Sequence, residues 1–255
     1  MTTGLERALL AITELELKMG WLEQKLLEWP TAHAAALLNQ LCESAERADP
    51  CAREALVPVV LLVASHGDWE PVARLREEAT GRRLLALDRL LRVGPASPYR
   101  ERPASQLPIP DYGAGRELTL GERRSLARRP TRRAFDKLLA DPHPMVIRLL
   151  LHNPKLTEAD VVRLIARRPA RVEAMREVSR TSHWLCRARV RHAILLNPGS
   201  PPEIAAPLLL LCPRTELLEI VHSTDTPGAL RATALELLER RPPLREPAGR
   251  ARVLQ

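Results

Sequence analysis

The chain has 255 residues, of which 45% are hydrophobic and only 3% aromatic, with 23 prolines and a formal net charge of +8. This length is enough for one long domain or two. No apolar run approaches the ~20 residues of a membrane span, the N-terminus lacks the pattern of a signal peptide, and the four cysteines are scattered. We therefore expect a cytoplasmic protein that does not enter a membrane.

Residues 3–29 have the apolar spacing of one long helix. The apolar positions alternate three and four residues apart, as in a coiled coil, at Leu5, Ala8, Ile12, Leu15, Met19, Leu22, Leu26 and Trp29. One interpretation is a helix packed inside an intramolecular bundle, which the short loops that follow favour. The other is self-association through Leu5, Ile12, Leu15, Met19, Leu22 and Leu26.

Three further helices are expected before residue 94, which makes residues 1–93 an N-terminal bundle of about four helices. Their expected spans are residues 31–47, with Thr31 as N-cap, residues 50–67, and residues 71–93 with Gly81 as a point of interruption. Residues 94–115 contain five prolines and three glycines. This composition predicts a linker, which either swings freely or lies along the second module through Leu107, Ile109 and Tyr112.

Regularly spaced prolines predict a stack of short helices over residues 116–241. They stand at positions 130, 142, 154, 169, 198, 213, 227 and 242. Proline lacks a backbone N–H and moves the preceding residue out of the α region, so each step ends a helix of two to three turns. In the one interval of double length we expect a helix break near Ser182. Residues 242–255 are expected to form a mobile tail.

Two internal matches support a repeat array. Residues 146–154 align without gaps with residues 190–198, and both segments end in Asn-Pro. Ala-Arg-Arg-Pro at residues 127–130 recurs at residues 166–169. Thr119 and Thr157, which precede the two copies, are expected N-caps. The predicted fold class is therefore all-α, a helical bundle followed by an α-solenoid.

The Asn-Pro, Asp-Pro and Arg-Pro steps after short Leu/Val-rich helices resemble those of bacterial leucine-rich-repeat-variant and HEAT-like helical repeat proteins. The resemblance covers roughly residues 107–241. It implies an α-solenoid and says little about activity. The founder type of the leucine-rich-repeat variant has a cysteine cluster for an iron–sulfur centre, and because this chain has no such cluster, the resemblance implies no cofactor here.

The sequence contains no recognisable catalytic or metal-binding motif. There is no nucleophile elbow, phosphate-binding glycine loop, dinucleotide fingerprint or His-Glu-x-x-His. His183-x-x-Cys186 is a single pair, whereas zinc sites usually combine two close pairs. We therefore expect no catalytic residues, no metal and no cofactor.

The arginines provide the candidate binding site. Residues 116–191 carry 19 basic and 8 acidic side chains, whereas residues 1–93 carry 11 and 14. Equivalent positions of a solenoid stack on one surface, so the repeated Ala-Arg-Arg-Pro predicts a basic ridge. Its members are Arg123, Arg124, Arg128, Arg129, Arg132, Arg133, Arg163, Arg167, Arg168 and Arg171. The alternative interpretation is that these arginines cap helix C-termini.

Three functions remain open at this point. The preferred one is a non-enzymatic scaffold or adaptor whose solenoid groove and basic ridge bind an acidic partner protein. The second is nucleic-acid binding through the phosphate backbone. The third is an enzyme of the alkylpurine DNA glycosylase type, which is built on HEAT-like repeats, although no segment here matches that active site.

Overall fold

The structure is a computed structural model that describes residues 4–94 and 104–241, apart from the side chains of Arg132 and Arg133. Within these ranges it contains sixteen α-helices and two short 3-10 helices and no β-strand, which confirms the all-α class. No helix in this part of the chain combines the length and apolar character that a membrane crossing requires. Residues 95–103 of the predicted linker and the predicted tail 242–255 lie outside the described residues.

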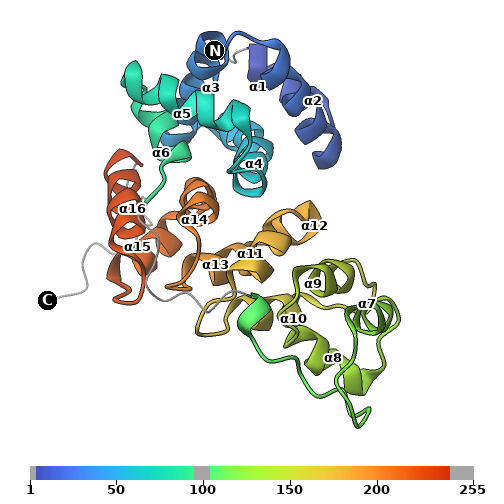
Figure 1. Cartoon of the computed structure of the whole chain (residues 1–255). Coiled ribbons are helices and arrows are strands. Elements are labelled where there is room, and N and C mark those ends of the chain that lie inside the picture. Colours follow the sequence, from blue (N-terminus) through green and yellow to red (C-terminus); the bar gives the residue numbers. More distant parts are fainter. Residues whose placement is uncertain (1–3, 95–103, 242–255) are drawn as a thin grey trace, which may run out of the picture.

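The first part of the chain forms six helices, which occupy the upper part of Figure 1. They are α1 (Gly4–Ala11), α2 (Leu15–Glu28), α3 (Thr31–Glu46), α4 (Pro50–Ser65), α5 (Glu70–Gly81) and α6 (Leu85–Leu91). The expected spans of α3 and α4 are confirmed, and the last expected span is interrupted after Gly81 as predicted. Thr31 is not the N-cap of α3, because Pro30 occupies that position and no side chain caps the helix.

The prediction of a single helix over residues 3–29 is wrong. The chain leaves the helix after Ala11, and Glu14 has an extended backbone with φ −84° and ψ 131°. Ile12 and Thr13, at the break, are β-branched and therefore less favourable in a helix. The break allows α1 to pack on both α3 and α4 while α2 packs on α4.

The broken helix also interrupts the expected coiled-coil seam. Leu5, Leu22 and Leu26 are buried inside the chain, and Leu15 and Met19 are partly buried against the same core. Self-association through this stretch stays a prediction, but it cannot use one continuous helix.

Helix α4 is the centre of the hydrophobic core. Its residues from Leu56 to Ser65 are buried except for Val57, which is partly buried. A helix that is apolar on every side must be covered on every side. Helices α1, α2 and α3 cover α4 from one part of the chain, and α11, α12 and α14 cover it from the other.

After η1 (Ala104–Gln106), the described residues up to 241 contain ten α-helices, which fill the lower part of Figure 1. They are α7 (Leu120–Arg128), α8 (Arg132–Leu139), α9 (Pro144–Leu151), α10 (Glu158–Ile165), α11 (Val172–Ser179), α12 (Ser182–Leu185), α13 (Ala188–Leu195), α14 (Pro202–Leu208) with η2 (Leu209–Leu211), α15 (Arg214–His222) and α16 (Gly228–Arg240). The predicted proline breaks from 130 to 227 all fall between helices, and Pro242 lies outside the described residues. In the long interval the break lies at residues 180–181, and Ser182 begins the additional short helix α12.

The predicted threonine caps are confirmed. The hydroxyl of Thr119 accepts a hydrogen bond from the Glu122 N–H at 3.4 Å, and that of Thr157 accepts one from the Asp160 N–H at 3.3 Å. In each case the acidic side chain accepts a bond from the threonine N–H in return. These reciprocal capping boxes satisfy N–H groups that have no partner inside the helix.

The two Asn-Pro steps make equivalent contacts. The amide nitrogen of Asn153 donates to the carbonyls of Ala127 and Arg128, at the end of α7, at 3.4 and 3.2 Å. The amide nitrogen of Asn197 donates to the carbonyl of Ile165, the last residue of α10, at 2.6 Å and to that of Arg167, two residues further on, at 3.0 Å. Each asparagine therefore donates to carbonyls at or just after the end of an earlier helix, where the helix itself supplies no donor.

Contacts also cross the predicted linker. Helix α14 packs against α4 and α6, and Arg92, directly after α6, forms an ion pair of 2.9 Å with Glu236 of α16. The Tyr112 hydroxyl donates to Asp141 at 2.6 Å. Tyr112 therefore anchors the chain before α7, as the alternative in which the linker lies along the second module requires. The division into modules 1–93 and 116–241 stays a prediction.

Candidate functional site

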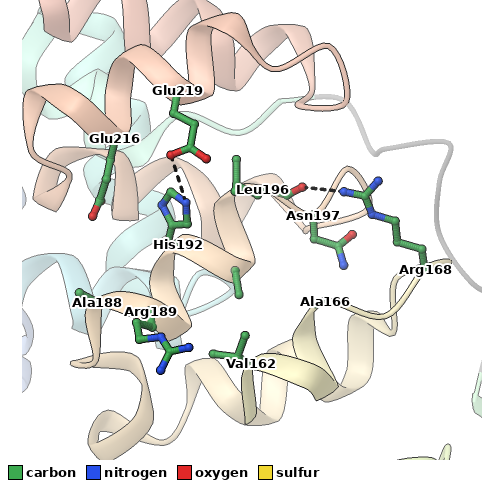
Figure 2. A pocket seen from close by; sticks show the side chains of 11 residues that line it. Val162, Ala166, Arg168, Ala188, Arg189, His192, Leu196, Asn197, Glu216 and Glu219 are labelled. Atoms are coloured by element: carbon green, nitrogen blue, oxygen red, sulfur yellow. Dashed lines mark hydrogen bonds and ion pairs between the residues drawn. The ribbon is translucent and has the colours of Figure 1, made fainter. Parts of the chain in front are cut away.

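A groove lies between α10, α13 and α15 (Figure 2). Helix α13 packs on α10, and His192 on α13 contacts Glu219 on α15, with 3.4 Å between Nε2 and Oε2. Several of the side chains that α10 and α13 present to the groove are small, so an open space remains between these helices and α15. The groove has a volume of about 610 Å³, which is within the usual range of ligand sites.

The apolar lining of the groove comes from one face of α13 and the end of α10. Ala188, Ala193 and Leu196 belong to α13 or its C-cap, and Val162 and Ala166 to α10 or its C-cap. Three of these five residues are alanines, whose short side chains leave the groove open. Apolar side chains of another molecule can therefore pack against this lining without moving the side chains that form it.

Charged residues of opposite sign border the groove. Glu216 and Glu219 lie on the α15 side, and Arg189 points into the opening from α13, beside Val162 (Figure 2). Arg189 is exposed and forms no ion pair within the described residues. The Nδ1 atom of His192 is buried and has no hydrogen-bond partner among the described residues. A ligand with an acidic group would therefore meet an unpaired guanidinium beside apolar surface.

The structure buries Arg123, the first member of the predicted basic ridge. Its guanidinium contacts Asp141 at 2.7 Å, and the two residues are 5% and 0% exposed. This ion pair holds α7 to the turn before α9. Arg123 is therefore a structural residue and does not reach the surface.

Other members of the ridge are engaged with neighbouring groups. Arg163 pairs with Asp160 and, at 3.5 Å, with Asp136. Arg168 pairs with Asp225 at 2.6 Å and contacts the carbonyl of Leu196 at the groove (Figure 2).

Two more ridge arginines, Arg171 and Arg167, also have partners. Arg171 donates to the carbonyl of Ala140, at the C-cap of α8. Arg167 likewise interacts with another group of the chain. For Arg171 the structure agrees with the alternative interpretation, in which an arginine caps a helix end.

Arg128 and Arg129 remain as exposed members of the ridge, at the end of α7. Neither side chain forms an ion pair in the part of the chain that the structure describes. Arg124 is partly buried, and its Nε has no hydrogen-bond partner in residues 4–94 and 104–241 as far as their side chains are described. Arg132 and Arg133 belong to α8, but their side chains lie outside the described part.

Among the predicted ridge residues whose side chains the structure describes, Arg168 alone lines the groove. Sequence reasoning missed Arg189, His192, Glu216 and Glu219 as members of one site. For α13 the sequence does contain a sign that these residues share a helix face. The sign is a spacing of three, one and three residues between Arg189, His192, Ala193 and Leu196. No pattern in the sequence places α15 opposite that face.

The cysteines do not gather around a metal site. Burial raises the pKa of the Cys42 and Cys212 thiols, and the carboxylates of Glu46 and Glu216 respectively raise them further. Both thiols therefore stay protonated near neutral pH. Residues 4–94 and 104–241 contain no group of three or more His, Cys, Asp or Glu side chains that could hold a metal ion.

Comparison of the chain with family models, with curated proteins and with solved structures gave no match.

Proposed function

We propose that this chain is a non-enzymatic interaction protein, a HEAT-like stack of short helices that holds a segment of a partner protein in the groove between α10, α13 and α15. The contacts of Asn153 and Asn197 support the stacked-repeat interpretation, because each asparagine follows one helix and donates to carbonyls at the end of an earlier one. The packing of α9 against both α7 and α11 agrees with it.

The observation that carries the proposal is the pairing of an apolar groove with the unpaired guanidinium of Arg189. Its partner is a polypeptide segment with aliphatic side chains for the alanine-lined surface and an aspartate or glutamate for Arg189. Burial of apolar surface contributes most of the affinity in such sites, and the charge pair fixes orientation and specificity.

Selection of random twelve-residue peptides displayed on phage tests this proposal. Wild-type protein is the bait, and the Ala188→Trp variant serves for counter-selection, because Ala188 is an exposed groove residue whose enlargement fills the site. We expect the enriched peptides to combine aliphatic and acidic residues. A chosen peptide, measured by fluorescence polarisation, should bind Ala188→Trp at least about tenfold more weakly.

Matched variants on α16 provide the controls. Ala232 is an exposed alanine outside the groove, and Ala232→Trp should bind the peptide as wild type does. Arg189→Glu should weaken binding, whereas the same change at exposed Arg231 should not. Peptides that bind all four variants equally would place recognition elsewhere and refute the groove as the site.

Exposed Arg128 and Arg129 favour a second candidate function, contact with the phosphate backbone of a nucleic acid. Their guanidinium groups lie close together in sequence and have no carboxylate to neutralise them in the described chain. In a gel-shift assay at low salt, the Arg128→Ala/Arg129→Ala variant should bind DNA or RNA more weakly than wild type. Binding by wild type should also weaken steeply as the salt concentration rises. The Arg7→Ala/Arg231→Ala variant removes the same charge elsewhere, and an equal effect from that pair would exclude this site.

A further inference from the structure

A second cavity, of about 420 Å³, lies where the two parts of the chain meet, between α4, the end of η2 and the start of α13. Three arginines line it: Arg53 from α4, Arg191 from α13, and Arg241 from the position directly after α16. Its apolar lining includes Val57, Leu211 and Pro213. None of these residues belongs to the groove between α10, α13 and α15.

Each of the three arginines is fixed by a backbone carbonyl. The Nε atom of Arg53 donates to the Ala45 carbonyl at 3.2 Å. One terminal nitrogen of Arg191 donates to the carbonyls of Leu185 and Cys186.

Arg241 is fixed more extensively than the other two. Its two terminal nitrogens donate to the carbonyls of Cys212 and, at 2.8 Å, Leu210. A guanidinium has five N–H donors, so Arg53, Arg191 and Arg241 are held in position while donors remain for a ligand.

These charges have no carboxylate partner. None of the three arginines forms an ion pair within the described residues, although Arg241 is only 7% exposed and its Nε atom is buried without a hydrogen-bond partner. Burial lowers the pKa of Arg241, and the positive charges of Arg53 and Arg214 lower it further, against the opposing effect of Glu46. Glu54 contributes the one carboxylate of the lining, so three guanidinium groups face one negative charge.

We propose that this cavity binds a small organic phosphate monoester, with the phosphate at Arg53, Arg191 and Arg241 and the carbon skeleton against Val57, Leu211 and Pro213. Capping of carbonyls explains why each arginine is present, but it does not require three of them to converge on one cavity. Arg241 is a buried cation without a carboxylate partner, which is costly, and a bound anion offsets that cost. A phosphate dianion balances the excess of two positive charges, and its oxygens match the fork of donors on guanidinium.

Titration calorimetry with phenyl phosphate on the full chain tests the proposal. We expect phenyl phosphate to bind more tightly than inorganic phosphate, which lacks the apolar part, and more tightly than benzoate, which carries one negative charge. Loss of one charge-assisted contact typically costs about a factor of ten in affinity. The Arg53→Ala and Arg191→Ala variants should therefore each weaken binding about tenfold, while Arg231→Ala, on the exposed side of α16, should not.

Alkylation of the two exposed cysteines gives an independent measurement in the same molecule. Cys186 lines the cavity and Cys51 does not. Phenyl phosphate should slow the reaction of Cys186 with iodoacetamide, followed by mass spectrometry, and leave Cys51 unchanged.

Three results would overturn the site: no detectable binding of phenyl phosphate, equal affinity in Arg53→Ala and wild type, or equal protection of both cysteines. Thermal unfolding of each variant verifies that it is folded, and Arg53 is exposed, so its replacement is the safer of the two.

Discussion

At the level of single residues, Asp141 shows how one buried carboxylate joins three segments. It accepts hydrogen bonds from the Arg123 guanidinium on α7, from the Tyr112 hydroxyl before α7, and from the N–H of His143 at the start of α9. The run of arginines to which Arg123 belongs predicts a surface position, whereas the structure buries this residue. Composition gives the number of charged residues, but only packing decides which of them are buried in an ion pair with a carboxylate.

Replacement of Arg123 by methionine should lower the free energy of unfolding by about 3–5 kcal/mol, because it leaves Asp141 charged and unpaired in the interior. Urea denaturation of wild type and variant measures this. The double variant Arg123→Met/Asp141→Leu should recover part of the loss. Equal stability of Arg123→Met and wild type would mean that Asp141 has solvent access, contrary to the structure.

The Tyr112 hydroxyl should make stability depend on alkaline pH. Burial raises its pKa above the ordinary value of about 10, and the hydrogen bond to Asp141 raises it further. The folded state then keeps a proton that the unfolded state loses, so stability is complete below pH ~10 and falls as pH rises beyond it.

Urea midpoints measured between pH 8 and 11 should therefore fall less steeply above pH ~10 for Tyr112→Phe than for wild type. The buried thiols of Cys42 and Cys212 contribute a separate decline in both proteins, so the difference between the two curves is the informative quantity. Parallel curves would contradict the role of the hydroxyl.

At the level of the elements, most of the helix ends could be predicted from the sequence. Proline removes a donor and restricts the residue before it, and threonine three residues before an acid forms a capping box; both effects are local. The break at Ile12 and Thr13 could not be predicted in this way, because it depends on where α3 and α4 lie. The same limit applies to the groove, since its α15 side comes from tertiary packing alone.

Asn153 and Asn197 should contribute equally to stability if the two Asn-Pro steps are equivalent. Replacement of either by alanine leaves two carbonyls at or just after the end of an earlier helix without their donor and should cost about 1–3 kcal/mol. Urea denaturation of the two single variants measures both effects, with Asn39→Ala on α3 as a control in a different contact. A neutral result at one site and a large one at the other would argue against equivalence.

At the level of the whole molecule, α4 binds the first and second parts of the chain into one hydrophobic cluster. The ion pair of Arg92 with Glu236 and the packing of α14 on α6 extend the contact. The proline-rich stretch after residue 93 predicts a separate N-terminal bundle over residues 1–93, and that division stays a prediction. The apolar character of α4 on every side was the available sign that its cover comes from further along the chain.

The two parts of the chain should therefore unfold together. Trp21, Trp29 and Trp69 report on the first part, and Trp184, which donates to the Leu151 carbonyl at 2.8 Å, reports on the second. In the Trp21→Phe/Trp29→Phe/Trp69→Phe variant and in Trp184→Phe, fluorescence and far-ultraviolet circular dichroism should give the same urea midpoint. Separate midpoints within one variant would instead support two independently folding modules.

The guanidinium groups that close helix ends have a consequence for the composition of the chain. Arg53, Arg171, Arg191, Arg214 and Arg241 each satisfy carbonyls at the end of a helix, and a lysine could not donate to two of them from one planar group. Each arginine that bonds to helix-end carbonyls in this way adds one positive charge, whether or not an anion is bound. A fold assembled from many very short helices has many ends to close, so a high isoelectric point can be a by-product of its construction.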